Sequence, residues 1–183
     1  ARPQMFQLVK YVLSRADGII VPTLLLNDIY SKFYNISPDK IMVIGNPLML
    51  QEEKFSEELA PPVILFAGRL VAYKNLSLVI KTFDLIAKRI RDAKLLIIGS
   101  GPDKEALSDL ARSLPSALRI SVGEPQTQDK LFDIIKGARV CLGPALTEFN
   151  PNCILECLSF GKPVLVSREN GLTINLPEEF LFD

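Results

Sequence analysis

Short, continuously apolar segments alternate along this chain with longer segments whose apolar residues recur at helical spacing. Strands buried on both faces are unbroken apolar runs, whereas a helix that covers a sheet shows a period of about 3.6 residues. The predicted strands of the larger part are 63–67, 95–98, 119–122, 140–142 and 163–166. The predicted helices are 75–90, which Asn75 can cap, 103–114, 128–136 and 151–160, which Gly161 can close in the left-handed conformation. This alternation predicts an α/β fold with a doubly wound parallel sheet.

The first 48 residues repeat the pattern on a smaller scale. Helical spacing over 4–15 is followed by an apolar strand at 19–21, a helix that Thr23 caps, and a strand at 41–44. The sequence then becomes acidic and proline-rich, as is typical of a linker. The predicted organisation is a remnant of a second α/β domain at 1–48, a linker at 49–61 and the main domain at 62–183.

Composition narrows the choice of function. Lys plus Arg equals Asp plus Glu at 21 each, so the basic surface of a nucleic-acid-binding protein is not expected. The chain has no histidine, which excludes a Ser-His-Asp or Cys-His catalytic unit within it. Three cysteines without a CxxC pair indicate reduced thiols and a cytoplasmic protein. No apolar run approaches the ~20 residues of a membrane span, so no transmembrane segment is expected.

Two carboxylates, Glu148 and Glu156, flank the start of a predicted helix. Asn150 is a preferred N-cap and Pro151 suits the first helical position. The helix N-terminus would offer phosphate three amides, those of Asn152, Cys153 and Ile154. If both carboxylates face one pocket, they can accept hydrogen bonds from hydroxyl groups, as a sugar nucleotide requires. The alternative is an acidic loop that caps a helix, with Glu156 in solvent.

Cations and glycines follow other predicted strands at the same edge of the sheet. Gly68 allows a tight turn, and Arg69 and Lys74 can then neutralise a diphosphate from two sides. Gly101 and Gly123 end two further strand segments. The turn at 99–101 lacks the third small residue of a dinucleotide-binding fingerprint, so a dehydrogenase is not favoured. Solvated charges and turns without a ligand remain the alternative.

Three phrases together are similar to a known family. They are Leu65-Phe66-Ala67-Gly68-Arg69-Leu70 with Lys74, Ile97-Ile98-Gly99-Ser100-Gly101-Pro102, and Glu148 through Glu156 with Gly161-Lys162-Pro163-Val164. In order and spacing they resemble the group-1 (family 4) retaining glycosyltransferases of the GT-B fold. The resemblance implies that 62–183 is the Rossmann-like donor domain and that 1–48 ends the acceptor domain.

The resemblance also implies roles for single residues. Arg69 and Lys74 would bind the donor diphosphate, Glu148 the sugar hydroxyls and Glu156 the ribose, while Gly101 and Gly123 would border the base. The donor would be a nucleotide-diphosphate sugar and the acceptor a carbohydrate or a lipid-linked molecule. No cofactor and no metal ion would be needed. Peripheral membrane contact could come through the missing part of the acceptor domain.

One segment departs from the family pattern. Where the family often has small residues after the first glutamate, this chain has Phe149-Asn150-Pro151-Asn152. Two other functions stay open, a non-catalytic nucleotide-binding Rossmann-like module and another GT-B enzyme such as a nucleotide-sugar epimerase. Because most of the acceptor domain is missing, we expect the 183 residues to bind donor but to transfer little sugar.

Overall fold

A computed structural model describes residues 3–48, 61–171 and 176–183. The chain divides into two compact units, Ala1–Pro47 and Leu48–Asp183. The predicted linker lies almost entirely outside the described residues. Each unit is described by itself.

The small unit contains the elements that its pattern predicts. They are α1 (Pro3–Arg15), β1 (Ile19–Val21), α2 (Leu24–Tyr34), the 3-10 turn η1 (Pro38–Lys40) and β2 (Ile41–Val43). The two strands are parallel. Thr23 caps α2 as expected, because its Oγ1 accepts a hydrogen bond of 3.3 Å from the amide of Leu26.

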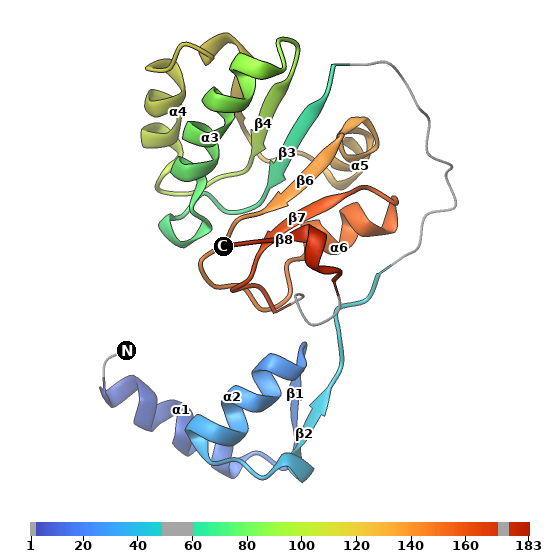
Figure 1. The fold of residues 1–183 in the computed structure, drawn as a ribbon. Helices are drawn as coiled ribbons and strands as arrows, with labels where there is room; N and C mark the ends of the chain where they lie inside the picture. Colours follow the sequence, from blue (N-terminus) through green and yellow to red (C-terminus); the bar gives the residue numbers. More distant parts are fainter. Residues whose placement is uncertain (1–2, 49–60, 172–175) are drawn as a thin grey trace. The chain divides into compact units, whose positions relative to one another are not determined.

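The large unit is a six-stranded, wholly parallel sheet with the order β5-β4-β3-β6-β7-β8 (Figure 1). Its strands are β3 (Val63–Ala67), β4 (Lys94–Ile98), β5 (Ile120–Gly123), β6 (Val140–Gly143), β7 (Val164–Ser167) and β8 (Leu181–Phe182). Its helices are α3 (Leu76–Arg89), α4 (Lys104–Arg112), α5 (Gln128–Gly137) and α6 (Asn152–Ser159), with 3-10 turns η2 (Ala72–Lys74), η3 (Ala117–Arg119) and η5 (Glu178–Phe180). The predicted doubly wound fold is therefore confirmed.

Both faces of the central strands are covered, which explains their unbroken apolar sequences. Phe66 and Ile97 belong to a core cluster that includes residues of α3 and α4. Leu65 and Val164 belong to a second cluster, with residues of α5 and α6. Right-handed crossovers place the helices on opposite faces because the winding direction reverses between β5 and β6. β8 was not predicted, since two residues are too few to show a period.

Neither predicted asparagine cap makes a side-chain bond, although Asn75 does occupy the N-cap position of α3. Asn75 has a left-handed backbone (φ 54°), and its side chain makes no capping bond; its amide instead donates to the carbonyl of Ala72 at 3.0 Å and closes η2. At α6 the N-cap position belongs to Pro151, which has no side-chain oxygen, and Asn150 lies one residue too early. The predicted ending is confirmed, because Gly161 follows α6 with φ 66°.

Candidate functional site

The reversal of winding creates a crevice at the carboxyl ends of β3 and β6, which are neighbours in the sheet. Ligands of open α/β sheets bind at such a switch point. A small pocket lies there, lined by Phe66, Ala67, Lys74, Leu142, Gly143, Pro144, Ala145, Glu148, Pro151, Cys153, Ile154 and Asn170. Its volume of about 20 Å³ holds about one water molecule. Sequence and topology thus place a cation, a carboxylate and the first turn of α6 in one pocket.

Lys74 and Glu148 form an ion pair in this pocket, although 74 positions separate them in the chain. The Lys74 Nζ donates to the Glu148 Oε2, and the two side chains are only 12% and 20% exposed. Sequence reasoning placed both residues in the site but gave them separate partners. The structure shows that each is the other's partner.

The backbone of Glu148 is held on both sides. Its amide donates to the carbonyl of Glu169 at 3.3 Å, and its carbonyl accepts from the amide of Gly171 at 2.7 Å. Its Oε1 accepts from the amide of Phe149 at 3.2 Å. The carboxylate is therefore anchored, and the segment after β6 is tied to the segment after β7.

Arg69 lies outside the pocket lining, on the exposed turn after β3. Its Nη2 donates to the Tyr73 hydroxyl at 2.6 Å, and its guanidinium lies 5.9 Å from the centre of the Tyr73 ring. The Lys74 Nζ lies 5.5 Å from the same ring. Tyr73, which sequence reasoning missed, therefore lies beside both cations. The signal available was only its position, one residue before Lys74.

The two glycines of the turn after β4, Gly99 and Gly101, have a packing role that the sequence did not reveal. A Cβ on Gly101 would lie 2.2 Å from the carbonyl oxygen of Leu70, and one on Gly99 would lie 1.8 Å from that of Gly68. The turn after β4 thus packs directly on the turn after β3, where the amide of Leu70 donates to the carbonyl of Ser100 at 2.8 Å. A Cβ added at Gly123 would meet nothing closer than 4.0 Å.

One of the amides predicted to bind phosphate, that of Ile154, is already bonded. The amide of Ile154 donates to the carbonyl of Pro151 at 3.1 Å, inside the first turn of α6. Asn152 and Cys153 begin the helix, and Cys153 and Ile154 also line the pocket. The helix N-terminus still places its partial positive charge at the crevice, but Ile154 is not available as a donor.

Glu156 is half-buried in the middle of α6 and does not line the pocket. The expectation that both carboxylates face one pocket is therefore not met. Among the described residues, its carboxylate has no hydrogen-bond or ion-pair partner, and burial raises its pKa. Glu156 is thus a partly desolvated carboxylate that could accept hydrogen bonds from a ligand lying beyond the pocket.

Residues 50–174 match the family model described as glycosyl transferases group 1, which is more than half of the chain. The chain belongs to the group 1 glycosyltransferases.

Curated relatives agree with this family. This glycosyltransferase chain is 32% identical, over 127 residues, to an uncharacterized glycosyltransferase of Haemophilus influenzae, covering 69% of this chain and 35% of the relative. It is 26% identical over 183 residues to the D-inositol 3-phosphate glycosyltransferase of Mycobacteroides abscessus, covering 92% of this chain and 40% of the relative. The chain thus spans well under half the length of these two relatives.

Solved structures share the fold. Anabaena Alr3699/HepE in complex with UDP-glucose superimposes with a TM-score of 0.85 at 14% identity, covering all of this chain and 54% of that one. The lipopolysaccharide outer core galactosyltransferase WaaB, in its apo form, gives a TM-score of 0.68 at 22% identity, covering 93% of this chain and 47% of that one. Both identities are low, so these matches establish the GT-B fold alone.

The three cysteines of this glycosyltransferase chain lie together, and Cys141 and Cys157 are buried. The pKa of the Cys157 thiol is raised, chiefly by hydrogen bonding with Cys141, and also by hydrogen bonding with Cys153 and by burial. A protonated thiol is neither a metal ligand nor a nucleophile. The described residues hold no group of three side chains suited to a metal ion, and the absence of a metal requirement stays a prediction.

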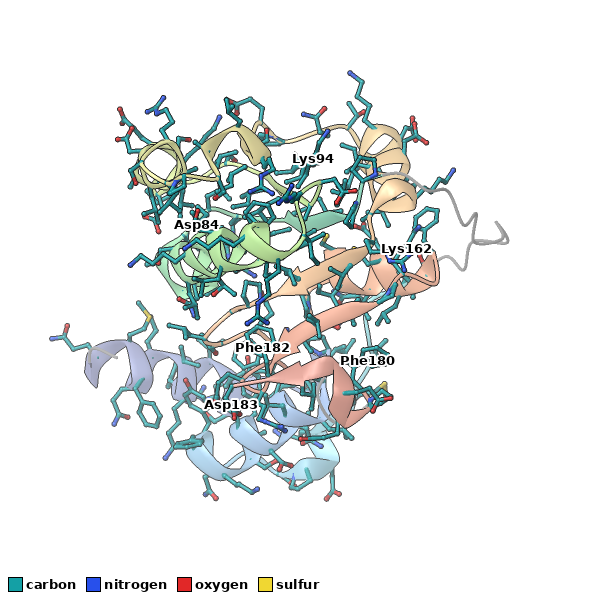
Figure 2. The ribbon with its side chains drawn as sticks, turned by 45° about the horizontal axis from the view of Figure 1, so that its top comes forward. Asp84, Lys94, Lys162, Phe180, Phe182 and Asp183 are labelled. Atoms are coloured by element: carbon teal, nitrogen blue, oxygen red, sulfur yellow. The ribbon has the colours of Figure 1, made fainter. Side chains whose placement is uncertain are left out.

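Two further residues of the glycosyltransferase have roles that the sequence did not reveal. Lys162 is 8% exposed, and its Nζ donates to the carbonyl of Lys136 at the end of α5 (Figure 2). Asn170 is 1% exposed, lines the pocket and pairs with Glu148 in an isolated bridge.

None of the helices in the described parts of the chain combines the length and apolar character that crossing a bilayer requires.

Replacing Glu156 by glutamine is expected to raise the melting temperature of the glycosyltransferase chain at neutral pH, by a few degrees at most. Because burial raises the folded-state pKa above the ordinary value of 4.5, the folded state binds the proton more tightly than the unfolded state. Stability of the native protein therefore falls as pH rises from about 4.5 through the raised pKa, and glutamine avoids this loss.

Melting curves between about pH 4 and about pH 8 measure this effect. The Glu156→Gln advantage should be absent at the acidic end and present at the neutral end. Glu179→Gln, the same change at an exposed position, should shift the melting temperature little. An equal advantage of Glu156→Gln at every pH would contradict the burial argument.

Proposed function

We propose that this chain is the donor-binding part of a retaining glycosyltransferase, which transfers a hexose from a nucleotide-diphosphate sugar to a carbohydrate or lipid-linked acceptor. One observation carries the proposal. The switch-point pocket brings together Lys74, Glu148 and the first turn of α6, which are a cation, a hydrogen-bond acceptor and a positive helix end. A sugar diphosphate has groups for each of them.

In this proposal the residues divide the donor between them. Arg69, Lys74 and the start of α6 stabilise the diphosphate, whose negative charge grows as the bond to the anomeric carbon breaks. Glu148 accepts hydrogen bonds from sugar hydroxyls, and Glu156 accepts them from the ribose. Gly68, Gly101 and Gly123 shape the edge that the base would meet. As the acceptor oxygen bonds to the anomeric carbon, the bond from that carbon to the diphosphate oxygen breaks, and the proton of the acceptor hydroxyl passes to the leaving nucleoside diphosphate.

The names of several solved neighbours support this donor class. UDP and glucose are bound to Anabaena Alr3699/HepE, and UDP and GlcNAc to the pneumococcal O-GlcNAc transferase GtfA. The chain spans 54% and 33% of those two chains. We therefore expect these 183 residues alone to bind donor but to transfer sugar slowly. We also expect a cytoplasmic protein with reduced thiols, which needs neither a cofactor nor a metal ion.

Calorimetric titration with a panel of UDP-, GDP- and ADP-sugars tests the proposal. At least one nucleotide sugar should bind to the chain, and the matching nucleoside monophosphate should bind about tenfold more weakly, since it lacks the second phosphate that the cations hold. EDTA should leave the affinity unchanged. If the whole panel failed to bind, the proposed function would be wrong. Donor binding without transfer in the full-length protein would instead favour the non-catalytic module.

A further inference from the structure

The Lys74–Glu148 ion pair lines the pocket to which the proposed function assigns the donor. The two side chains are 12% and 20% exposed, and the space left beside them, about 20 Å³, holds only about one water molecule. A hexose cannot occupy that space. A sugar hydroxyl can therefore take the place of the ammonium at Oε2 of Glu148 only if this pair opens.

The surrounding hydrogen bonds show which partner can move. Glu148 is anchored through its amide, its carbonyl and its Oε1, at 3.3, 2.7 and 3.2 Å. The Lys74 ammonium has three donors on a flexible four-carbon side chain, and among the described residues Glu148 is the only hydrogen-bond partner of its Nζ. The backbone of Glu148 and one of its carboxylate oxygens are thus held, whereas the Lys74 side chain is the partner that has freedom to move.

We infer that the donor binds by exchange: its diphosphate takes Lys74 from Glu148, and only then can Oε2 of Glu148 accept a hydrogen bond from a sugar hydroxyl. This inference rests on the proposed function and adds a condition to it. Recognition of the sugar depends on the diphosphate, because a single movement of Lys74 both binds the diphosphate and frees Glu148 for the sugar.

The exchange has an energetic signature. A partly buried carboxylate that loses its cation is left with an unsatisfied oxygen, which costs free energy unless another donor replaces the ammonium. A nucleoside diphosphate alone supplies no such donor, whereas a nucleotide sugar supplies a hydroxyl. Glu148 therefore opposes the binding of the diphosphate and favours the binding of the sugar conjugate.

The substitution Glu148→Gln separates these two effects. Calorimetry with UDP and UDP-glucose, or with the matching pair for the base that the panel selects, should show opposite changes. The variant should bind the nucleoside diphosphate about 3- to 10-fold more tightly than the wild type, because Lys74 no longer has a competing anion. The additional affinity conferred by the sugar should fall towards zero. A residue that only supported the fold would weaken both ligands.

Two controls isolate Lys74 as the mediator. Glu169→Gln removes an exposed negative charge from the same edge and should tighten diphosphate binding by less than twofold, since surface charges are screened. In a Lys74→Met background, Glu148→Gln should no longer tighten binding, which is a double-mutant cycle. Protection of the buried Cys141 and Cys157 from a thiol reagent verifies that each variant is folded.

The outcomes of this experiment are distinct. Tighter binding of the diphosphate that depends on Lys74 supports the exchange. If nucleotide sugar binds to the wild type but Glu148→Gln leaves the diphosphate affinity unchanged or lowers it, the exchange is wrong and the proposed function stands. If no nucleotide binds to the wild type, the proposed function fails and the exchange fails with it.

Discussion

Gly101→Ala should destabilise the large unit by about 3 kcal/mol or more and lower its melting temperature by about 6–12 °C. A Cβ at this position would lie 2.2 Å from the carbonyl oxygen of Leu70 and 2.8 Å from its amide nitrogen. Neither atom belongs to a flexible side chain, so the two turns after β3 and β4 would have to separate. The hydrogen bond from Leu70 to Ser100, at 2.8 Å, would be strained with them.

The cysteines provide a readout for this unit alone. All three lie in the large unit, and Cys141 and Cys157 are buried, so their reaction with a thiol reagent during denaturation follows its unfolding. Gly123→Ala is the matched control, because its added Cβ would meet nothing closer than 4.0 Å. It should change stability by no more than about 0.5 kcal/mol. Equal losses for both variants would show that close packing is not what requires glycine at position 101.

Apart from β8, the helices and strands of the described residues could be predicted from the sequence. Strands such as 63–67 are unbroken apolar runs because helices cover both faces of the sheet, and the helices between them show a regular apolar face. Right-handed crossovers then leave few topologies. Local chemistry also predicted the cap at Thr23 and the left-handed residue at Gly161 correctly, since each depends on neighbouring residues only.

The contacts inside the site could not be predicted in this way. The pairing of Lys74 with Glu148 joins residues 74 positions apart, and no local pattern encodes it. The close approach of Gly101 to Leu70 likewise depends on how two turns meet. Motif and order nevertheless brought Arg69, Lys74 and Glu148 to one edge of the sheet, because the carboxyl ends of parallel strands share that edge. The sequence thus predicted where Lys74 and Glu148 lie, but not that they pair with each other.

Asn150 and Asn75 show why local reasoning about caps failed. Asparagine is favoured at N-caps, but it also adopts the left-handed conformation more readily than most residues. At position 75 the 3-10 turn before α3 uses this second property, and the side chain is not needed as a cap. At position 150 the following proline shifts the start of the helix by one residue. One residue type supports two local structures, and the tertiary context selects between them.

Removal of both cations, in the double variant Arg69→Ala/Lys74→Met, should weaken nucleoside diphosphate binding about 100-fold or more. Each charge-assisted hydrogen bond to the diphosphate contributes about 1.5–3 kcal/mol where it is shielded from water, and less at an exposed position such as Arg69. Calorimetry in low and high salt measures the loss. The affinity of the double variant should also depend less on salt than that of the wild type, because fewer charges are screened.

Lys94→Met tests whether diphosphate binding depends on where a cation lies in the sheet or only on the net charge of the chain. Lys94 is an exposed cation at the first residue of β4, and thus at the amino end of a parallel strand rather than at its carboxyl end (Figure 2). If the switch-point crevice binds the diphosphate, Lys94→Met should bind it as the wild type does. An equal loss in Lys94→Met would mean that the diphosphate responds to net charge, and the crevice would no longer be its site.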